Sequence, residues 1–195
     1  MTEAPDRIVL GTGNAHKVVE LAAILGPLLP GVELLRNEGP SPVEDGDTFV
    51  ANALIKARAA HRGSGLPAIA DDSGIAVDAL DGAPGIRSAR YAGTGRDDDN
   101  RALLLERLGD ATDRGARFVC AAVYVDAERE LVEVREWEGA VVPTERGDGG
   151  FGYDPLFVPA DGGGRTAAEL TADEKNQLSH RGKAFRALAA AIAAR

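Results

Sequence analysis

The stretch RIVLGTGNAHKVVELAAIL at residues 7–25 predicts a strand, a loop and a helix in succession. Residues 7–10 form a short apolar run, and the glycine-bearing turn at residues 11–14 ends it. Apolar residues then recur every three or four positions as far as Leu25, which is the spacing of an amphipathic helix. The chain therefore opens with the strand and helix alternation that is typical of an α/β fold.

The remaining segments continue this mixture. Further strands are expected at residues 32–35, 66–70, 116–126, 130–142 and 156–158, and further helices at residues 48–61, 97–108 and 181–194. The turn at residues 126–129 would join two long strands as a hairpin, and the strands look mainly antiparallel. Because no repeat or linker divides the chain, we expect one domain with an α/β fold, in which helices flank an elongated mixed β-sheet.

The turn at residues 11–17 could bind phosphate. It offers backbone N–H groups at a helix N-terminus, and Lys17 follows one turn into the helix. The spacing is not that of a Walker loop, and His16 stands where a dinucleotide fingerprint has its third glycine. A literal fingerprint does occur at residues 147–152, but the segment after it contains Pro155 and cannot open a helix. Taken alone, a glycine-bearing turn of this kind can also be purely structural.

The segment Asp71-Asp72-Ser73-Gly74 is predicted to be a polar turn after an apolar strand. Catalytic carboxylates often lie at such positions in α/β folds, and carboxylate oxygens are the ligands that Mg²⁺ prefers. Two adjacent side chains of an extended chain point in opposite directions, so only one acid is expected to reach a site. Alone, the segment could equally be a solvated surface turn.

Other segments carry side chains that could contact a metal or a nucleotide. Glu44 could supply a second metal-binding carboxylate from its loop, and Lys56 lies on a predicted helix, where a lone lysine is normally solvated. Residues 151–155 place two aromatic rings and an acid in a glycine-flanked loop, where a base could stack and a carboxylate could accept a ring N–H. That pattern also fits a packed β-turn. The donors at residues 174–183 likewise fit a serine-capped helix with basic residues.

Composition limits the partners. The chain of 195 residues carries a formal net charge of −9, which disfavours loose binding to nucleic acid or to an anionic membrane. A polyanionic ligand would need a local cluster of lysine and arginine, together with a metal. Residues 1–7 do not resemble a leader peptide, and no apolar run approaches the ~20 residues that span a bilayer. We expect a cytoplasmic protein, with Cys120 as a small core residue.

Together these segments resemble the inosine triphosphate pyrophosphatase family, also called the dITP/XTP pyrophosphatases, from about Ile8 to Leu188. The signature pieces stand in the family's order: Thr12-Gly13-Asn14 with Lys17 and Glu20; Phe49 with Asn52, Ala53 and Lys56; Ala70-Asp71-Asp72-Ser73-Gly74; Gly82-Ala83-Pro84-Gly85-Ile86 with Ser88-Ala89-Arg90-Tyr91; Gly150-Phe151-Gly152-Tyr153-Asp154-Pro155; and Ser179-His180-Arg181-Gly182. Each piece alone is weak, whereas all of them in this order are very specific. At Thr144-Glu145-Arg146-Gly147 the family often has proline before the Arg-Gly pair, which leaves only the conformation of that loop in doubt.

The resemblance implies a two-lobed homodimer with the active site in the cleft between the lobes. It also implies a Mg²⁺-dependent hydrolysis of ITP, dITP and XTP to the monophosphate and pyrophosphate, which keeps deaminated purines out of DNA and RNA. Glu44 and Asp72 would hold the metal, and Asp72 would also accept the proton of the attacking water. By matching positions, the substrate would be bound by Thr12, Gly13, Asn14, Ala15, His16 and Lys17 around the triphosphate, by Lys56 beside it, by Ser73, and by Phe151, Gly152, Tyr153, Asp154, Lys175, His180 and Arg181 around the nucleotide and its base.

The chemistry of these residue types agrees with that implication. Cleavage between the α and β phosphates needs charge neutralisation, an in-line water and a base. Lysines and Mg²⁺ could neutralise the charge, and Asp72 could order and deprotonate the water, either directly or through the metal. In the base pocket, Arg181 could donate to the 6-oxygen and Asp154 could accept from the ring N–H, a pattern that adenine inverts.

Two other functions remain open from the sequence. A non-catalytic nucleotide sensor could use the same lysines and base loop, although the carboxylates Glu44 and Asp72 would disfavour pure binding of an anion. A hydrolase with another base pocket could act on modified pyrimidines or on standard triphosphates.

Overall fold

The computed structural model describes residues 5–194 and divides the chain into two compact units. The first unit comprises residues 1–72, 120–135 and 181–195, and the second comprises residues 73–119 and 136–180. Residues 1–4, the start of the segment expected not to be a leader, and Arg195 lie outside the described residues. In residues 5–194 no helix is long and apolar enough to cross a membrane.

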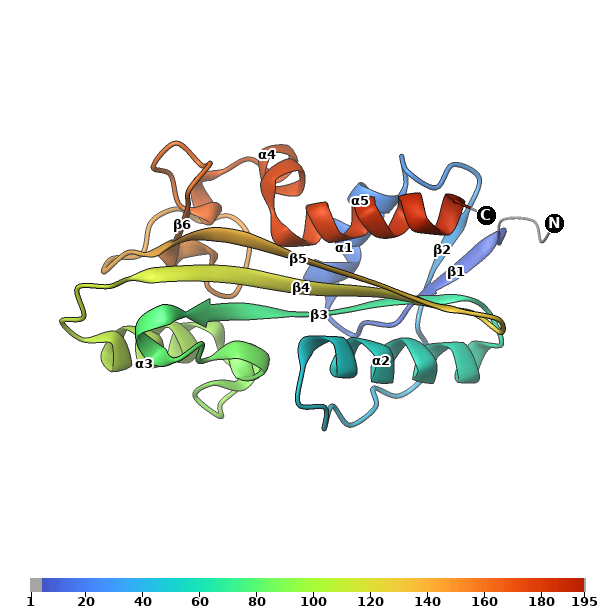
Figure 1. Cartoon of the computed structure of the whole chain (residues 1–195), viewed down its shortest axis with the longest axis horizontal. Coiled ribbons are helices and arrows are strands. Elements are labelled where there is room, and N and C mark those ends of the chain that lie inside the picture. Colours follow the sequence, from blue (N-terminus) through green and yellow to red (C-terminus); the bar gives the residue numbers. More distant parts are fainter. Residues whose placement is uncertain (1–4, 195) are drawn as a thin grey trace. The chain divides into compact units, whose positions relative to one another are not determined.

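Strands and α-helices alternate as far as residue 125, which agrees with the alternation predicted for the start of the chain. The strands are β1 (Arg7–Leu10), β2 (Glu33–Arg36), β3 (Ala68–Val77), β4 (Gly115–Val125), β5 (Glu130–Val141) and β6 (Phe157–Pro159), and the α-helices are α1 (Ala15–Leu25), α2 (Phe49–Ser64), α3 (Asp97–Leu108), α4 (Ala172–Leu178) and α5 (His180–Ala193). The strand order in the sheet is β2-β1-β3-β4-β5-β6 (Figure 1). β1 pairs in parallel with β2 and β3, whereas β6 pairs antiparallel with β5. The predicted mixed sheet is confirmed. The prediction that its strands are mainly antiparallel is wrong for β1, β2 and β3, which pair in parallel.

Local signals located most elements to within a few residues. The strand predicted at residues 7–10 and the helix predicted at residues 97–108 coincide with β1 and α3. The hairpin turn closes as predicted, since the Asp126 N–H donates to the Arg129 carbonyl at 3.1 Å. Thr48 caps α2, because its hydroxyl oxygen accepts from the Ala51 N–H at 3.1 Å. The short helix α4 has no counterpart among the predicted elements.

The first unit packs helices on both faces of its strands. Side chains alternate between the faces along each strand, so Ile69 of β3 packs in the layer with α1 and α5, while its neighbour Ala70 packs with α2. Figure 1 shows α2 on the opposite face of the strands from α1 and α5. The first layer also buries Cys120, Phe185, Leu188 and Ile192, which confirms Cys120 as a core residue and gives α5 an apolar face.

The second unit has a core of its own. Its buried residues come from the last part of β3, from α3, from the start of β4, from β5 and from β6, and they include Trp137. The indole N–H donates to Asp161 at 2.7 Å, which satisfies its one donor in the interior. Tyr153 belongs to this core, and its hydroxyl donates to the Ser88 carbonyl at 2.9 Å.

The turn predicted at residues 71–74 is wrong, because β3 continues through these residues to Val77. Charged residues inside a strand are tolerated when ion pairs compensate them, and Lys17 and Lys56 supply such pairs to Asp71 and Asp72. Gly74 does not bend the strand. A Cβ at this position would collide with the Gly85 carbonyl and the Ser88 hydroxyl, so glycine is needed for their close approach.

Candidate active site

The loop between β1 and α1 is tied down at both ends. The Gly11 N–H donates to the Ile69 carbonyl of β3 at 2.7 Å. At the helix start, the Asn14 side-chain oxygen accepts from the N–H groups of His16 and Lys17 at 2.9 and 3.2 Å. The Asn14 N–H in turn donates to the Thr12 hydroxyl oxygen at 3.2 Å. Asn14 is therefore the N-cap of α1, and it fixes the turn that was expected to cradle phosphate.

On the α1 and α5 face of β3, Asp71 is the centre of a buried ionic cluster. Its Oδ2 lies 2.9 Å from Lys17 Nζ and 3.3 Å from Arg181 Nη2, while Arg181 Nη1 lies 2.7 Å from Glu20 Oε2. Burial alone would raise the pKa of Asp71, but the charges of Lys17 and Arg181 hold it well below its usual range. The thiol of Cys120 lies 3.9 Å from the same carboxylate oxygen, and burial raises its pKa, which disfavours the reactive thiolate. Asp71 is thus an ionised anchor.

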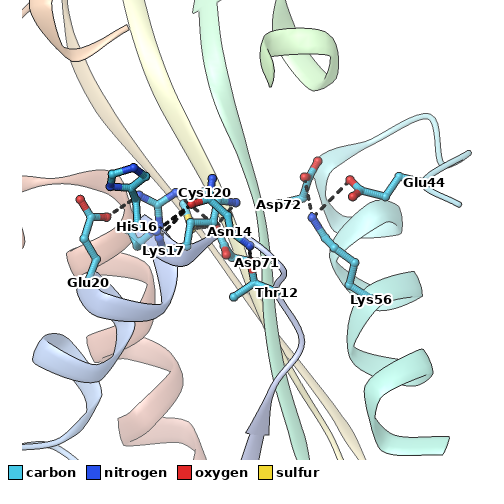
Figure 2. Close-up of polar contacts among 11 residues, drawn as sticks. Thr12, Asn14, His16, Lys17, Glu20, Glu44, Lys56, Asp71, Asp72 and Cys120 are labelled. Carbon is cyan, nitrogen blue, oxygen red and sulfur yellow. Dashed lines mark hydrogen bonds and ion pairs between the residues drawn. The ribbon is translucent and has the colours of Figure 1, made fainter. Parts of the chain in front are cut away.

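On the opposite face, Lys56 bridges two carboxylates. Its Nζ lies 2.8 Å from Asp72 Oδ1 and 3.3 Å from Glu44 Oε2, and Figure 2 shows the ammonium between them. Burial would lower the pKa of Lys56, but the charges of Asp71 and Asp72 raise it above its usual value. Burial raises the pKa of Asp72 above its usual value, although Lys56 acts to lower it. The prediction that the adjacent acids point in opposite directions is confirmed, although both of them bind lysine.

The position of Glu44 depends on α2. Asn52 is fully buried on this helix, and its side-chain oxygen accepts from the Gly46 N–H at 2.8 Å. A Cβ at Gly46 would lie only 2.7 Å from that oxygen, so the loop approaches the helix closely because residue 46 is a glycine. One helix therefore carries Lys56 and also holds the loop that carries Glu44. The sequence motif contained Asn52, but nothing in the pattern indicated this contact.

Glu44 and Asp72, the two carboxylates expected to hold a divalent cation, are brought together by their contacts with Lys56. Asp72 Oδ2 is buried and has no hydrogen-bond partner among residues 5–194, so it can still act as a ligand. Within the same residues no group of three or more His, Cys, Asp or Glu side chains could hold a metal ion by itself. Mg²⁺ commonly binds through one or two carboxylates together with substrate phosphates and water. The donor set therefore fits a metal that arrives with a phosphate ligand.

In the second unit, Asp154 organises the glycine-flanked loop. Its Oδ2 accepts from the Phe151 N–H at 2.8 Å and from Lys175 Nζ at 2.7 Å. The same ammonium lies 4.9 Å from the centre of the Phe151 ring, within the range of a cation–π contact. Phe151 is partly exposed, whereas Tyr153 is packed in the core. Of the two aromatic rings in this loop, Phe151 is the better platform for a base.

His180 is buried against aromatic rings of the second unit. Its ring stacks on Phe118, with centroids 4.8 Å apart and planes inclined by 8°. The predicted residues thus form two groups: the first unit holds Thr12, Gly13, Asn14, Ala15, His16, Lys17, Glu44, Lys56, Asp72 and Arg181, and the second holds Ser73, Phe151, Gly152, Tyr153, Asp154, Lys175 and His180. Glu20 and Asp71, which the sequence did not mark as site residues, belong to the first group through their ion pairs with Arg181 and Lys17.

The chain is similar to known proteins over nearly its whole length. A model of the Ham1 family matches residues 8–191. The dITP/XTP pyrophosphatase of Frankia alni is 52% identical over 193 residues, covering 94% of this chain and 95% of that protein. The dITP/XTP pyrophosphatase of Cutibacterium acnes is 48% identical over 197 residues, covering 96% and 97%. A solved HAM1 protein from Coxiella burnetii has a TM-score of 0.87 at 39% identity, covering 97% and 99%.

Proposed function

This chain belongs to the Ham1 family, and from that membership we infer that it hydrolyses deaminated purine nucleoside triphosphates such as dITP and XTP to the monophosphate and pyrophosphate. The observation that carries this inference is the near-complete match to dITP/XTP pyrophosphatases at about half identity. The first unit adds chemical support, since it combines a capped helix N-terminus, two lysines and a carboxylate pair. These are the groups that phosphoryl chemistry requires.

We propose that residues 12–17, Lys17 and Lys56 hold the triphosphate. Both ammonium groups are held by carboxylates, Lys17 by Asp71 and Lys56 by Asp72 and Glu44. Their positions are therefore fixed before a ligand arrives, which lowers the entropic cost of binding. The net charge of −9 means that this local positive charge must act against a negative background. The proposed cation at Glu44 and Asp72 would supply further charge neutralisation near the bond that breaks.

Asp72 is the proposed proton acceptor for the attacking water. Its Oδ1 is held by Lys56, so the carboxylate has a fixed orientation. Its Oδ2 has no partner among the described residues and can accept a hydrogen bond from water. A carboxylate with one oxygen fixed and the other available is suited to order a nucleophile and take its proton.

The proposed base ligands are Phe151, Asp154, Lys175, His180 and Arg181. A partly exposed Phe151 residue supports stacking, and a carboxylate such as that of Asp154 can accept from a purine ring N–H. Arg181 is a donor only, which suits the 6-oxygen of hypoxanthine or xanthine. Its guanidinium is already oriented by Glu20 and Asp71, which supports a fixed direction for its N–H groups. Tyr153 and Gly152 would then shape the loop around these side chains.

The reaction is tested by mixing the protein with Mg²⁺ and a panel of triphosphates, and by assaying pyrophosphate and orthophosphate separately. We expect pyrophosphate from dITP, ITP and XTP and very little product from ATP, because a mismatched polar pocket can discriminate by ~10⁴-fold. EDTA should abolish the activity, and added Mg²⁺ should restore it. Orthophosphate as the first product would contradict a pyrophosphatase, and binding without any product would indicate a nucleotide sensor.

Lys17→Ala and Lys56→Ala should each raise the KM for dITP by about tenfold, because each removes a charge that contacts the anion. Arg58→Ala is the matched control, since Arg58 lies on the same helix as Lys56 but forms an exposed pair with Glu130. Its KM should stay within about twofold of wild type. An unchanged KM in both lysine variants would remove these residues from the triphosphate site.

We also propose that the chain is a single domain of two lobes, assembles as a homodimer and acts in the cytoplasm. The lobes, the dimer and the location rest on the family resemblance. The negative net charge disfavours nucleic acid and anionic membranes as partners. Sedimentation velocity measures the dimer directly, and a single boundary at the mass of one chain would contradict it.

A further inference from the structure

Two side chains of α3 form hydrogen bonds with the backbone N–H and carbonyl of Gly152. Asp97 Oδ2 accepts from the Gly152 N–H at 2.8 Å, and Arg101 Nη1 donates to the Gly152 carbonyl at 2.9 Å. These two contacts fix the peptide planes before and after this residue. Gly152 has a positive φ of 63°, and the space where a Cβ would lie is open, so no packing on that side holds its backbone.

Arg101 also reaches the other end of the same loop. Its Nε donates to Glu145 Oε1 at 2.8 Å, and its remaining guanidinium nitrogen contacts Asp98. The Arg101 side chain is only 12% exposed, so these hydrogen bonds are partly shielded from water. One guanidinium therefore connects Glu145 at the start of the loop to Gly152 near its end. Glu145 stands where the family often has proline. Here the ion pair with Arg101 restrains the backbone of the loop instead of a proline ring.

We propose that Asp97, Arg101 and Glu145 are positioning residues that hold residues 145–154 in the shape that binds the purine base. This proposal rests on the proposed function, because it assigns the loop to the base. Gly152 lies between Phe151 and Asp154 in the sequence, and the Asp154 carboxylate accepts a hydrogen bond from the Phe151 N–H. Loosening Gly152 would therefore disorder both the stacking ring and the acceptor.

A simpler explanation for an acid at position 97 is that it stabilises α3 by interacting with the helix dipole. Asp97, Asp98 and Asp99 all lie in the first turn of α3, where a negative charge is favourable whatever it touches. Asp99 provides the comparison, since it has the same charge in the same turn and pairs only at 3.6 Å with exposed Arg96. If the dipole accounts for Asp97, then alanine at either position should have the same effect.

The test compares Asp97→Ala, Arg101→Ala and the control Asp99→Ala by hydrogen exchange of the segment 145–154 in the absence of nucleotide, and by steady-state kinetics on dITP. We expect faster exchange of this segment and a KM raised about tenfold in the first two variants, with kcat changed less than about twofold. Asp99→Ala should match wild type in both measurements. Asp97→Asn keeps an acceptor for the Gly152 N–H and should restore slow exchange.

Several results would overturn the proposal. One is unchanged exchange of the segment in both Asp97→Ala and Arg101→Ala, and another is an equal effect of Asp99→Ala. The proposal would also be contradicted if residues 145–154 exchanged as fast in Asp97→Asn as in Asp97→Ala. In that case the hydrogen bond from the Gly152 N–H to residue 97 would not protect the segment. Arg101→Lys keeps the positive charge but cannot donate to Glu145 and to the Gly152 carbonyl in the same way. It tests the role of these hydrogen bonds if Arg101→Ala fails to fold. Exchange needs no substrate, so a wild-type protein that fails to hydrolyse dITP would refute the proposed function separately.

Discussion

Asp72→Asn is expected to lower kcat for dITP by about 10²-fold or more while the fold and the KM change little. Asparagine keeps the volume of the side chain and an oxygen that can accept from Lys56, so the hydrogen bond of 2.8 Å has a replacement. It cannot take a proton from water, because an amide is not a base at neutral pH. The variant therefore separates the catalytic role of Asp72 from its contact with Lys56.

The measurement is steady-state turnover of dITP at saturating Mg²⁺, with the circular dichroism spectrum and Tm as controls for folding. Glu44 still contacts Lys56 in this variant, so the ammonium is not left without a carboxylate. A turnover close to that of wild type would remove Asp72 from the mechanism. A raised KM with normal kcat would make it a ligand of the substrate or metal instead of the proton acceptor.

Sequence patterns were sufficient for elements whose signals are local. The helix α2 has a threonine cap and a glycine after its last turn, and α3 has acidic residues in its first turn, so both could be predicted from short segments. The signature pieces likewise named the residues around Asp72 and Lys56. The cleft between lobes and the homodimer stay predictions.

Contacts between distant residues could not be predicted. The acids at 71 and 72 look like a turn because strands rarely contain adjacent charges. The charges that compensate them, on Lys17, Lys56 and Arg181, come from other parts of the chain. The link between Arg101 and Gly152 spans 51 positions and leaves no periodic signal. Aromatic residues next to a glycine gave no indication that Tyr153 belongs to the core while Phe151 stays partly exposed.

The structure gives Asp71 a structural role that the sequence did not indicate. Asp71 is fully buried and contacts both Lys17 and Arg181, and the Arg181 side chain is only 3% exposed. Removing one partner of a buried ion pair leaves an uncompensated charge in the interior. We therefore expect Asp71 to be more important for stability than for the chemical step.

Asp71→Ala should lower the free energy of unfolding by about 3–5 kcal/mol, measured by urea denaturation at constant m-value. Glu130→Ala is the matched control, because the pair between Glu130 and Arg58 is exposed on both sides and should contribute less than about 1 kcal/mol. Glu20 keeps one contact with Arg181 in the variant, but Lys17 loses the carboxylate that holds it. Because a domain is stable by only about 5–15 kcal/mol, part of the population should unfold near physiological temperature. A loss no larger than that of Glu130→Ala would mean that water or movement of Lys17 compensates the charge, and that the cluster around Asp71 does not hold the first unit together.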